Sequence, residues 1–193
     1  MCIRDRGSSV CSVCAPNASS SAGSFSASNC SCNAGFTGPN GGPCLACAAG
    51  TFKDLPGSAS CVECAAGKFS RSTATVCTVC GAGKYSTTIG SNGVDNCLPC
   101  GVHADSAAGS TMKMNCSCNA GFSSPRTDSN RTWLDCVACK AGKYSVKSTA
   151  SGNNCSTCQA GTYQDANGAS ACVMCDQGKY SSGSGQTHCR RVL

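Results

Sequence analysis

The chain has 193 residues, of which 22 are cysteine, and it carries a net charge of +6 at pH 7. Leu, Ile, Val and Phe are too scarce for a sizeable hydrophobic core, so many small disulfide-closed loops are the predicted source of stability. The lysines are spread singly along the chain, which excludes a basic patch for nucleic acid, and no run of about 18 apolar residues is present to span a membrane.

The two ends of the sequence do not fit the pattern of the rest. Residues 1–6, MCIRDR, resemble a translated sequencing adaptor, so we exclude them from the expected fold and treat Cys2 as foreign. Residues 190–193 are interpreted as a truncated end, because Val192 stands where the second cysteine of a further C-x-x-C pair belongs.

From residue 7 onward the cysteines come in pairs, mostly C-x-x-C, with loops of 11 to 17 residues between pairs. After most pairs the chain continues x-x-G-x-[Phe/Tyr], as in CVECAAGKFS from Cys61, and after the two C-x-C pairs it continues x-x-G-Phe. Eight of the nine Phe and Tyr residues occupy these positions. An aromatic tied to one cysteine offset is predicted to pack on the neighbouring disulfide.

The loops between the pairs are rich in Gly, Ser, Asn and Pro, which favour turns. Segments after the glycine, such as 51–53 and 84–86, predict strands of two to four residues that pair with the chain returning to the next cysteine. No helix of consequence is expected. The predicted fold is therefore a small disulfide-rich, elongated tandem array of short β-hairpin loops, in which each loop contacts only its neighbours.

A longer period contains this short one. A C-x-x-C pair, a polar loop and CSCNAGF at Cys30 recur 86 residues later, with CSCNAGF at Cys116. Each copy is followed by three G-x-[Phe/Tyr] loops, so five loops form one unit. The predicted units are 7–96 and 97–189.

Two regular pairing schemes each use all but one of the remaining cysteines. In the crossed scheme the first cysteine of one pair joins the first cysteine of the next pair, and the second joins the second, which leaves Cys189 unpaired. In the ladder the second cysteine of a pair joins the first of the next, which leaves Cys11 over. Each unit has an odd number of pairs, so crossed pairing would join Cys30 backward but its equivalent Cys116 forward, and this parity favours the ladder. The ladder bonds are Cys14 to Cys30, Cys32 to Cys44, Cys47 to Cys61, Cys64 to Cys77, Cys80 to Cys97, Cys100 to Cys116, Cys118 to Cys136, Cys139 to Cys155, Cys158 to Cys172 and Cys175 to Cys189.

The segment CLPCGVHADSAAGSTMKMNCSCNAGF at 97–122, with CVECAAGKFS and similar loops beside it, resembles the cysteine-rich, EGF-like region of ephrin receptors and the ephrin-receptor-like repeats of large surface proteins. Its C-x-C-x-x-G-Phe element alone also suits an EGF module, and the G-x-Tyr loops alone suit a tumour-necrosis-factor-receptor-type module. Together they favour the ephrin-receptor-like family over nearly all of 11–189. No kinase, ligand-binding or transmembrane region accompanies the resemblance, so signalling is not implied.

Residues that carry chemistry are few. His103 and His188 stand alone in polar loops and are interpreted as surface residues, and the aspartates form no paired-carboxylate pattern. We therefore predict no enzyme activity and no catalytic, metal or cofactor site. Repeated C-x-x-C also suits zinc ribbons, an alternative that the uninterrupted series of pairs disfavours. The loop 118–136 holds the only tryptophan, Trp133, beside Leu134. Two roles are considered for Trp133, packing within the loop and a binding hot spot.

The density of cysteine predicts an oxidising compartment, extracellular or at the cell surface. The predicted function is a structural, adhesion or spacer segment of a larger cell-surface or secreted protein, with other extracellular proteins as partners. The alternatives are a ligand-binding receptor ectodomain, with 118–136 as its candidate site, and a cysteine-rich zinc-binding protein. Asn17 and Asn130 are the predicted glycosylation sites, because the other sequons place asparagine directly before a cysteine, at Asn29, Asn115 and Asn154.

Overall fold

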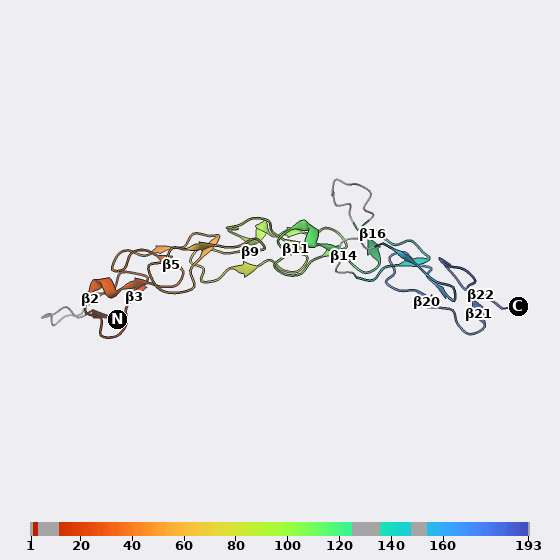
Figure 1. Ribbon diagram of the computed structural model, residues 1–193, viewed down its shortest axis with the longest axis horizontal. Coiled ribbons are helices and arrows are strands. Elements are labelled where there is room, and N and C mark those ends of the chain that lie inside the picture. The colour runs from red at the N-terminus through yellow and green to blue at the C-terminus, as the bar shows by residue number, and fades with distance from the viewer. Residues whose placement is uncertain (1, 4–11, 125–135, 148–153, 193) are drawn as a thin grey trace. The chain divides into compact units, whose positions relative to one another are not determined.

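The computed structural model describes residues 2–3, 12–124, 136–147 and 154–192. The chain divides into two units, one of Met1–Gly81 with Ser86–Leu98 and one of Ala82–Tyr85 with Pro99–Leu193. Both are built from very short strands joined by long loops (Figure 1).

Each described strand is two residues long, within the range that the sequence predicts. From Cys2 to Val79 the strands are β1 (Cys2–Ile3), β2 (Ser12–Val13), β3 (Ala18–Ser19), β4 (Ser31–Cys32), β5 (Phe36–Thr37), β6 (Leu45–Ala46), β7 (Thr51–Phe52), β8 (Val62–Glu63), β9 (Lys68–Phe69) and β10 (Thr78–Val79). From Lys84 onward they are β11 (Lys84–Tyr85), β12 (Leu98–Pro99), β13 (Ala104–Asp105), β14 (Ser117–Cys118), β15 (Phe122–Ser123), β16 (Val137–Ala138), β17 (Lys143–Tyr144), β18 (Ser156–Thr157), β19 (Thr162–Tyr163), β20 (Val173–Met174), β21 (Lys179–Tyr180) and β22 (Arg190–Arg191). The helical segments of the described ranges are three 3-10 turns, η1 (Ala27–Asn29), η2 (Val94–Asn96) and η3 (Lys113–Asn115).

A hairpin forms where the strand after a glycine pairs antiparallel with the two residues between the cysteines of the next C-x-x-C. In the β7–β8 pair, for example, Phe52 lies opposite Val62 and Thr51 lies opposite Glu63. The C-x-C pairs shift this register by one residue, so Cys32 itself joins a strand, opposite Ala18. The sequence therefore predicts both the strands and their partners.

β1 and β2 form the first such pair, with Cys2 opposite Val13 and Ile3 opposite Ser12. The two residues of β1 come from the segment 1–6 that the sequence analysis sets aside. Their backbone groups fill the place that a strand of a preceding loop would take.

Ten disulfides close the loops, each between residues 12 to 18 positions apart in sequence. Every bond joins the second cysteine of one pair to the first cysteine of the next, from Cys14–Cys30 to Cys175–Cys189, which is the ladder and not the crossed scheme. Cys11, left over by the ladder, lies outside the described residues.

Cysteine supplies the whole apolar interior of the described residues, since no other apolar side chain there is buried. Cys32, Cys64, Cys139 and Cys158 have no exposed surface. The rings of Phe52 and Tyr163 are only half-buried. Packing of these rings on the disulfides stays a prediction.

The expectation that each loop contacts only its immediate neighbours is wrong. Within the first unit Gly50, in loop 47–61, lies so close to Gly90, in loop 80–97, that a Cβ on Gly50 would overlap the Gly90 carbonyl. Within the second unit Gly142 and Gly185 are related in the same way, again two loops apart. The missing side chain lets one backbone pass directly against another, so each of these glycines also contacts the loop after next.

Thr73 occupies a position where other loops have glycine, with φ at 61°. Its amide donates to the Cys47 carbonyl at 2.9 Å, as the Gly90 amide donates to Cys64 at 2.7 Å. A β-branched residue is strained in this left-handed region. We expect Thr73→Gly to stabilise the protein by about 1 kcal/mol, measured by urea denaturation with the disulfides intact.

Ser72→Gly is the matched control for Thr73→Gly. Ser72 is exposed and does not have a positive φ. Glycine at this position therefore relieves no strain in the folded state and only raises the conformational entropy of the unfolded chain. We expect Ser72→Gly to destabilise. If both variants lose stability, the backbone at Thr73 is not strained.

Candidate functional site

The junction between successive loops is the most regular feature of the structure. The glycine amide of one loop donates to the carbonyl of the residue that follows the aromatic position in the next loop. Gly50 donates to Ser70 at 3.0 Å, and Gly161 donates to Ser181 at 3.0 Å. We call the receiving residue the junction residue; the set is Lys53, Ser70, Ser86, Ser106, Ser145, Gln164 and Ser181.

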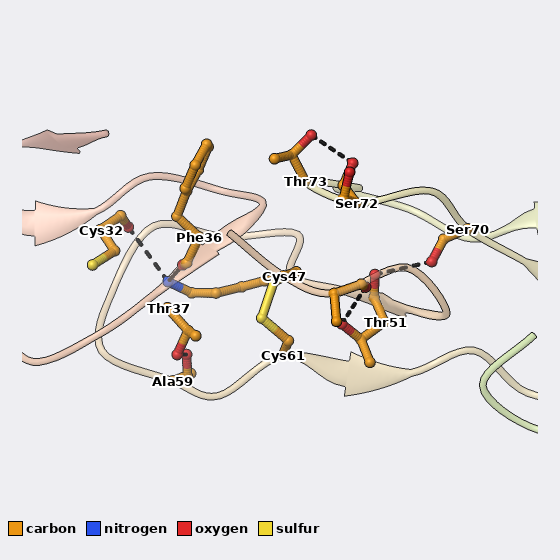
Figure 2. The surroundings of a disulfide bond; sticks show 12 residues. Cys32, Phe36, Thr37, Cys47, Thr51, Ala59, Cys61, Ser70, Ser72 and Thr73 are labelled. Atoms are coloured by element: carbon orange, nitrogen blue, oxygen red, sulfur yellow. Dashed lines mark hydrogen bonds between the residues drawn. A yellow bond between two sulfur atoms is a disulfide. The ribbon is translucent and has the colours of Figure 1, made fainter. Parts of the chain in front are cut away.

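Many junction residues also return a hydrogen bond through the side chain. The Ser70 hydroxyl donates to the carbonyl of Thr51, the residue after Gly50, at 2.9 Å (Figure 2). Ser145 and Ser181 donate in the same way to the preceding loop, at 2.9 Å and 3.0 Å. Two hydrogen bonds of opposite direction therefore join these neighbouring loops.

Junction residues are buried although they are polar, with exposed fractions between 0% for Ser86 and 8% for Ser106. A buried hydroxyl costs free energy unless it is hydrogen-bonded, so each one favours the relative placement of loops that supplies its partner. The junction residues were not predicted from the sequence. Their signal is a polar residue, usually serine, at one fixed offset after the aromatic.

Lys53 stands at a junction position like the serines, but its side chain is a charged ammonium group and not a hydroxyl. Its ammonium group donates to the carbonyls of Phe36 at 2.7 Å and Cys32 at 3.4 Å, and to the carbonyl of Gly57. Phe36 follows Gly35 as Thr51 follows Gly50, so the long side chain reaches the same acceptor that serine uses elsewhere. Three carbonyls match the three N–H groups of the ammonium.

The outer face of the hairpins carries exposed aliphatic side chains at the first residue inside C-x-x-C. Leu45 is 69% exposed, Val62 59% and Val137 54%. Val62 lies opposite Phe52 across the hairpin, and Val173 lies opposite Tyr163. The loop 118–136 is the one loop that the sequence offers as a ligand-binding apolar cluster, and its Trp133 and Leu134 lie outside the described residues. The hairpins offer apolar contact positions as well.

Both histidines are exposed. His103 holds the glycine position of its loop, with φ at 57°, and its ring stacks on Phe122 with centroids 3.9 Å apart. The Asn119 amide donates to the His103 carbonyl at 2.8 Å. His103 therefore links the polar loop to the CSCNAGF motif.

The sequon asparagines differ in their surroundings. Asn17 is exposed on a turn with φ at 61°. The side-chain oxygens of Asn29 and Asn115 accept backbone amides of Ser26 and Met112, at 3.1 Å and 3.0 Å, which ties these two side chains to the 3-10 turns. Asn130 lies outside the described residues.

Within the ranges that the structure describes, no group of three or more His, Cys, Asp or Glu side chains is arranged to hold a metal ion. In the same ranges no helix has the length and apolar character needed to cross a membrane.

Two exposed ion pairs perturb the acidic groups. Lys147 donates to Asp105 at 2.7 Å across two loops, and Lys179 pairs with Asp176 at 2.8 Å within one loop. The hydrogen bond from Lys147, followed by that from the Ser106 amide, holds the pKa of Asp105 below its ordinary value. The hydrogen bond from Lys179 likewise lowers the pKa of Asp176.

The Asp105–Lys147 pair predicts a pH dependence of stability. Because the folded pKa of Asp105 is lowered, its contribution is complete above the unfolded pKa of about 3.9 and is lost as the pH falls through the folded pKa. We expect Lys147→Met to cost about 0.2 to 1 kcal/mol at pH 7, the range for exposed pairs, and almost nothing at pH 2, measured by urea denaturation.

Lys143→Met, at an exposed lysine on β17, is the control and should cost little at either pH. A Lys147→Met penalty of the same size at both pH values would show that the side chain acts through packing.

One comparison with known proteins finds a match, and it lies in the first unit. A comparison with curated proteins found no match. Residues 35–76 match the family described as tyrosine-protein kinase ephrin type A/B receptor-like. The matched span contains Gly35 and Gly50 with their acceptors Lys53 and Ser70, so it holds two consecutive loop junctions. Residues 35–76 are therefore similar to an ephrin-receptor-like cysteine-rich repeat.

Proposed function

We propose that this chain is an extracellular spacer or adhesion segment of a larger cell-surface or secreted protein, without enzymatic activity. The observation that carries the proposal is the series of ten disulfide-closed loops, in which a glycine amide of one loop bonds to the junction residue of the next loop at the seven described junctions. Such a series gives a defined separation between whatever is attached to its ends, and it needs an oxidising compartment.

The family match supports an extracellular receptor-type module. The recurrence of CSCNAGF after 86 residues is the basis for proposing that 7–96 and 97–189 are repeating units, and the bonds between successive loops are the basis for proposing that the array is elongated. The role as a spacer depends on that elongation.

The zinc-binding alternative is disfavoured by the state of the sulfur atoms. Zinc is held by thiolates, whereas 20 of the 22 cysteines are joined in disulfides.

Binding of other extracellular proteins is a second role that one observation favours. An exposed valine lies opposite a half-buried ring in two hairpins, at Val62 with Phe52 and at Val173 with Tyr163, and exposed Leu45 and Val137 stand at the same place in two further hairpins. A partner with an extended apolar face could contact several hairpins at once. A receptor with one ligand would instead concentrate its affinity in a single loop, for which 118–136 remains the candidate.

The proposed function is tested on the chain secreted from a eukaryotic host. We expect almost no reactive thiol by titration, disulfide-linked peptides such as Cys47 with Cys61, and a radius of gyration by small-angle X-ray scattering well above the roughly 16 Å of a compact domain of this length.

Retention in the cell with about twenty reactive thiols, or stoichiometric zinc, would contradict the extracellular assignment. A fully oxidised chain with a radius of gyration near 16 Å would contradict the spacer role alone.

Asn17 and Asn130 are proposed to carry N-linked glycans in the secreted protein. We expect Asn17→Gln to remove one glycan, seen as a lower mass that enzymatic deglycosylation abolishes, because Asn17 is exposed on a turn. Asn130→Gln should do the same. Asn29→Gln is the control and should leave the mass of the glycans unchanged, since the Asn29 side chain holds the Ser26 amide. Glycan loss in Asn29→Gln and not in Asn17→Gln would reverse the assignment.

A further inference from the structure

Among the described residues, the Oγ atom of Ser20 is the one buried side-chain nitrogen or oxygen that has no hydrogen-bond partner. Ser20 stands at the junction position of its loop: Asn17 holds the glycine position, β3 (Ala18–Ser19) follows, and Ser20 comes next. Buried hydroxyls are almost always hydrogen-bonded in folded proteins. An unpaired one at this position therefore calls for an explanation.

The second long unit shows what this position does when its partner is present. Ser106 lies 86 residues after Ser20, at the same place in the repeat. Its carbonyl accepts the Gly83 amide at 3.0 Å, and its hydroxyl donates to the Lys84 carbonyl at 2.9 Å. Both partners come from a C-x-x-G-x-Tyr loop that directly precedes the polar loop.

β1 does not replace such a loop at Ser20. Cys2 and Ile3 pair with β2 and so fill the strand position, yet the Ser20 hydroxyl is left without an acceptor. By its pairing with β2, Cys2 stands at the first strand position, which Thr51 holds in β7, yet its carbonyl does not accept the Ser20 hydroxyl. What β1 does not bring is the glycine, whose amide bonds to the serine carbonyl and so places that strand carbonyl at Gly50–Ser70, Gly121–Ser145 and Gly161–Ser181.

We propose that Ser20 is the receiving side of a loop junction, and that its occupant is a disulfide-closed C-x-x-G-x-[Phe/Tyr] loop joined directly before β2. The glycine amide of that loop donates to the Ser20 carbonyl, and the carbonyl after the glycine accepts the Ser20 hydroxyl. This assignment depends on junction geometry and not on the proposed extracellular role.

The occupant is a loop of the same chain and not a second molecule. At the other junctions the donor loop runs directly into the C-x-x-C pair whose inner residues complete its hairpin, as loop 47–61 runs into β8. Two hydrogen bonds to a separate molecule are too weak to repay the loss of its free motion, whereas a covalently attached loop acts at high effective concentration.

The first test uses Ser20→Ala and Ser106→Ala in the chain as given. Removing an unpaired buried hydroxyl takes away no hydrogen bond, so we expect Ser20→Ala to leave the unfolding equilibrium constant within about twofold of the parent or to lower it. Ser106→Ala removes a formed bond and should raise that constant roughly fivefold. A loss in Ser20→Ala equal to that in Ser106→Ala would show that Ser20 already has a partner, and the proposal would be overturned.

The second test replaces residues 1–11 with a copy of residues 80–97, which brings a Gly-Lys-Tyr loop and its disulfide to the face of Ser20. In this grafted chain Ser20→Ala should become costly, with a roughly fivefold rise in the unfolding equilibrium constant. The amide of the grafted glycine should exchange its hydrogen at least about tenfold more slowly in the folded graft than in the same chain unfolded in urea, because it donates to the backbone carbonyl of residue 20. An unprotected glycine amide in a folded graft would overturn the proposal.

Analytical ultracentrifugation of the 193-residue chain tests whether a second copy of the chain, and not an attached loop, occupies the face of Ser20. We expect a monomer across the concentration range, with or without Ser20→Ala. Association that rises with concentration and disappears in Ser20→Ala would assign this face to a second copy and overturn the assignment to an attached loop.

Discussion

The hydrogen bond from a loop glycine to the junction carbonyl of the next loop is the interaction on which the rest of the structure depends. The disulfides cannot take this role, because each one closes a single loop and none joins the body of one loop to the body of the next. They stabilise the fold by restricting the unfolded chain. Consecutive loops share only the two residues inside a C-x-x-C pair, so their relative placement depends on the backbone of Gly50 and its equivalents, and on the hydroxyl that returns from Ser70 and its equivalents.

Glycine is needed at residue 50 for two separate reasons. Its left-handed backbone, with φ at 89° for Gly50, turns the chain after the cysteine, and its missing Cβ admits the carbonyl of the loop after next. One residue type thus satisfies a local turn and a contact some 40 residues away in sequence. Asn17 and His103 hold the same position in the polar loops, and asparagine and histidine are residues that tolerate positive φ.

The parts of the fold that depend on cysteine spacing could be predicted from the sequence. The fixed offset from cysteine to glycine to aromatic predicts a strand of two to four residues in a disulfide-closed loop, and the structure has two. The odd number of cysteine pairs per repeat favours the ladder that the structure adopts. The junction serines could not be predicted by the same reasoning, because a serine after an aromatic in a turn-rich loop has the composition of solvent-exposed chain. Its burial results from the neighbouring loop, so the fixed offset after the aromatic marks the position of the serine but does not indicate that it is buried. The approach of Gly50 to Gly90 was missed for the same reason.

This division of roles also bears on function. The interior groups that hold the loops together are backbone amides, carbonyls, small hydroxyls and sulfur, and they impose no requirement on the residues inside C-x-x-C. Those residues range from Val62 and Glu63 in one hairpin to Ser156 and Thr157 in another, and all four are exposed. An array of this kind can change its outer surface from loop to loop without disturbing its junctions. Spacing would then be a property of the whole series, whereas any binding specificity would belong to individual hairpins and to the residues that each one exposes.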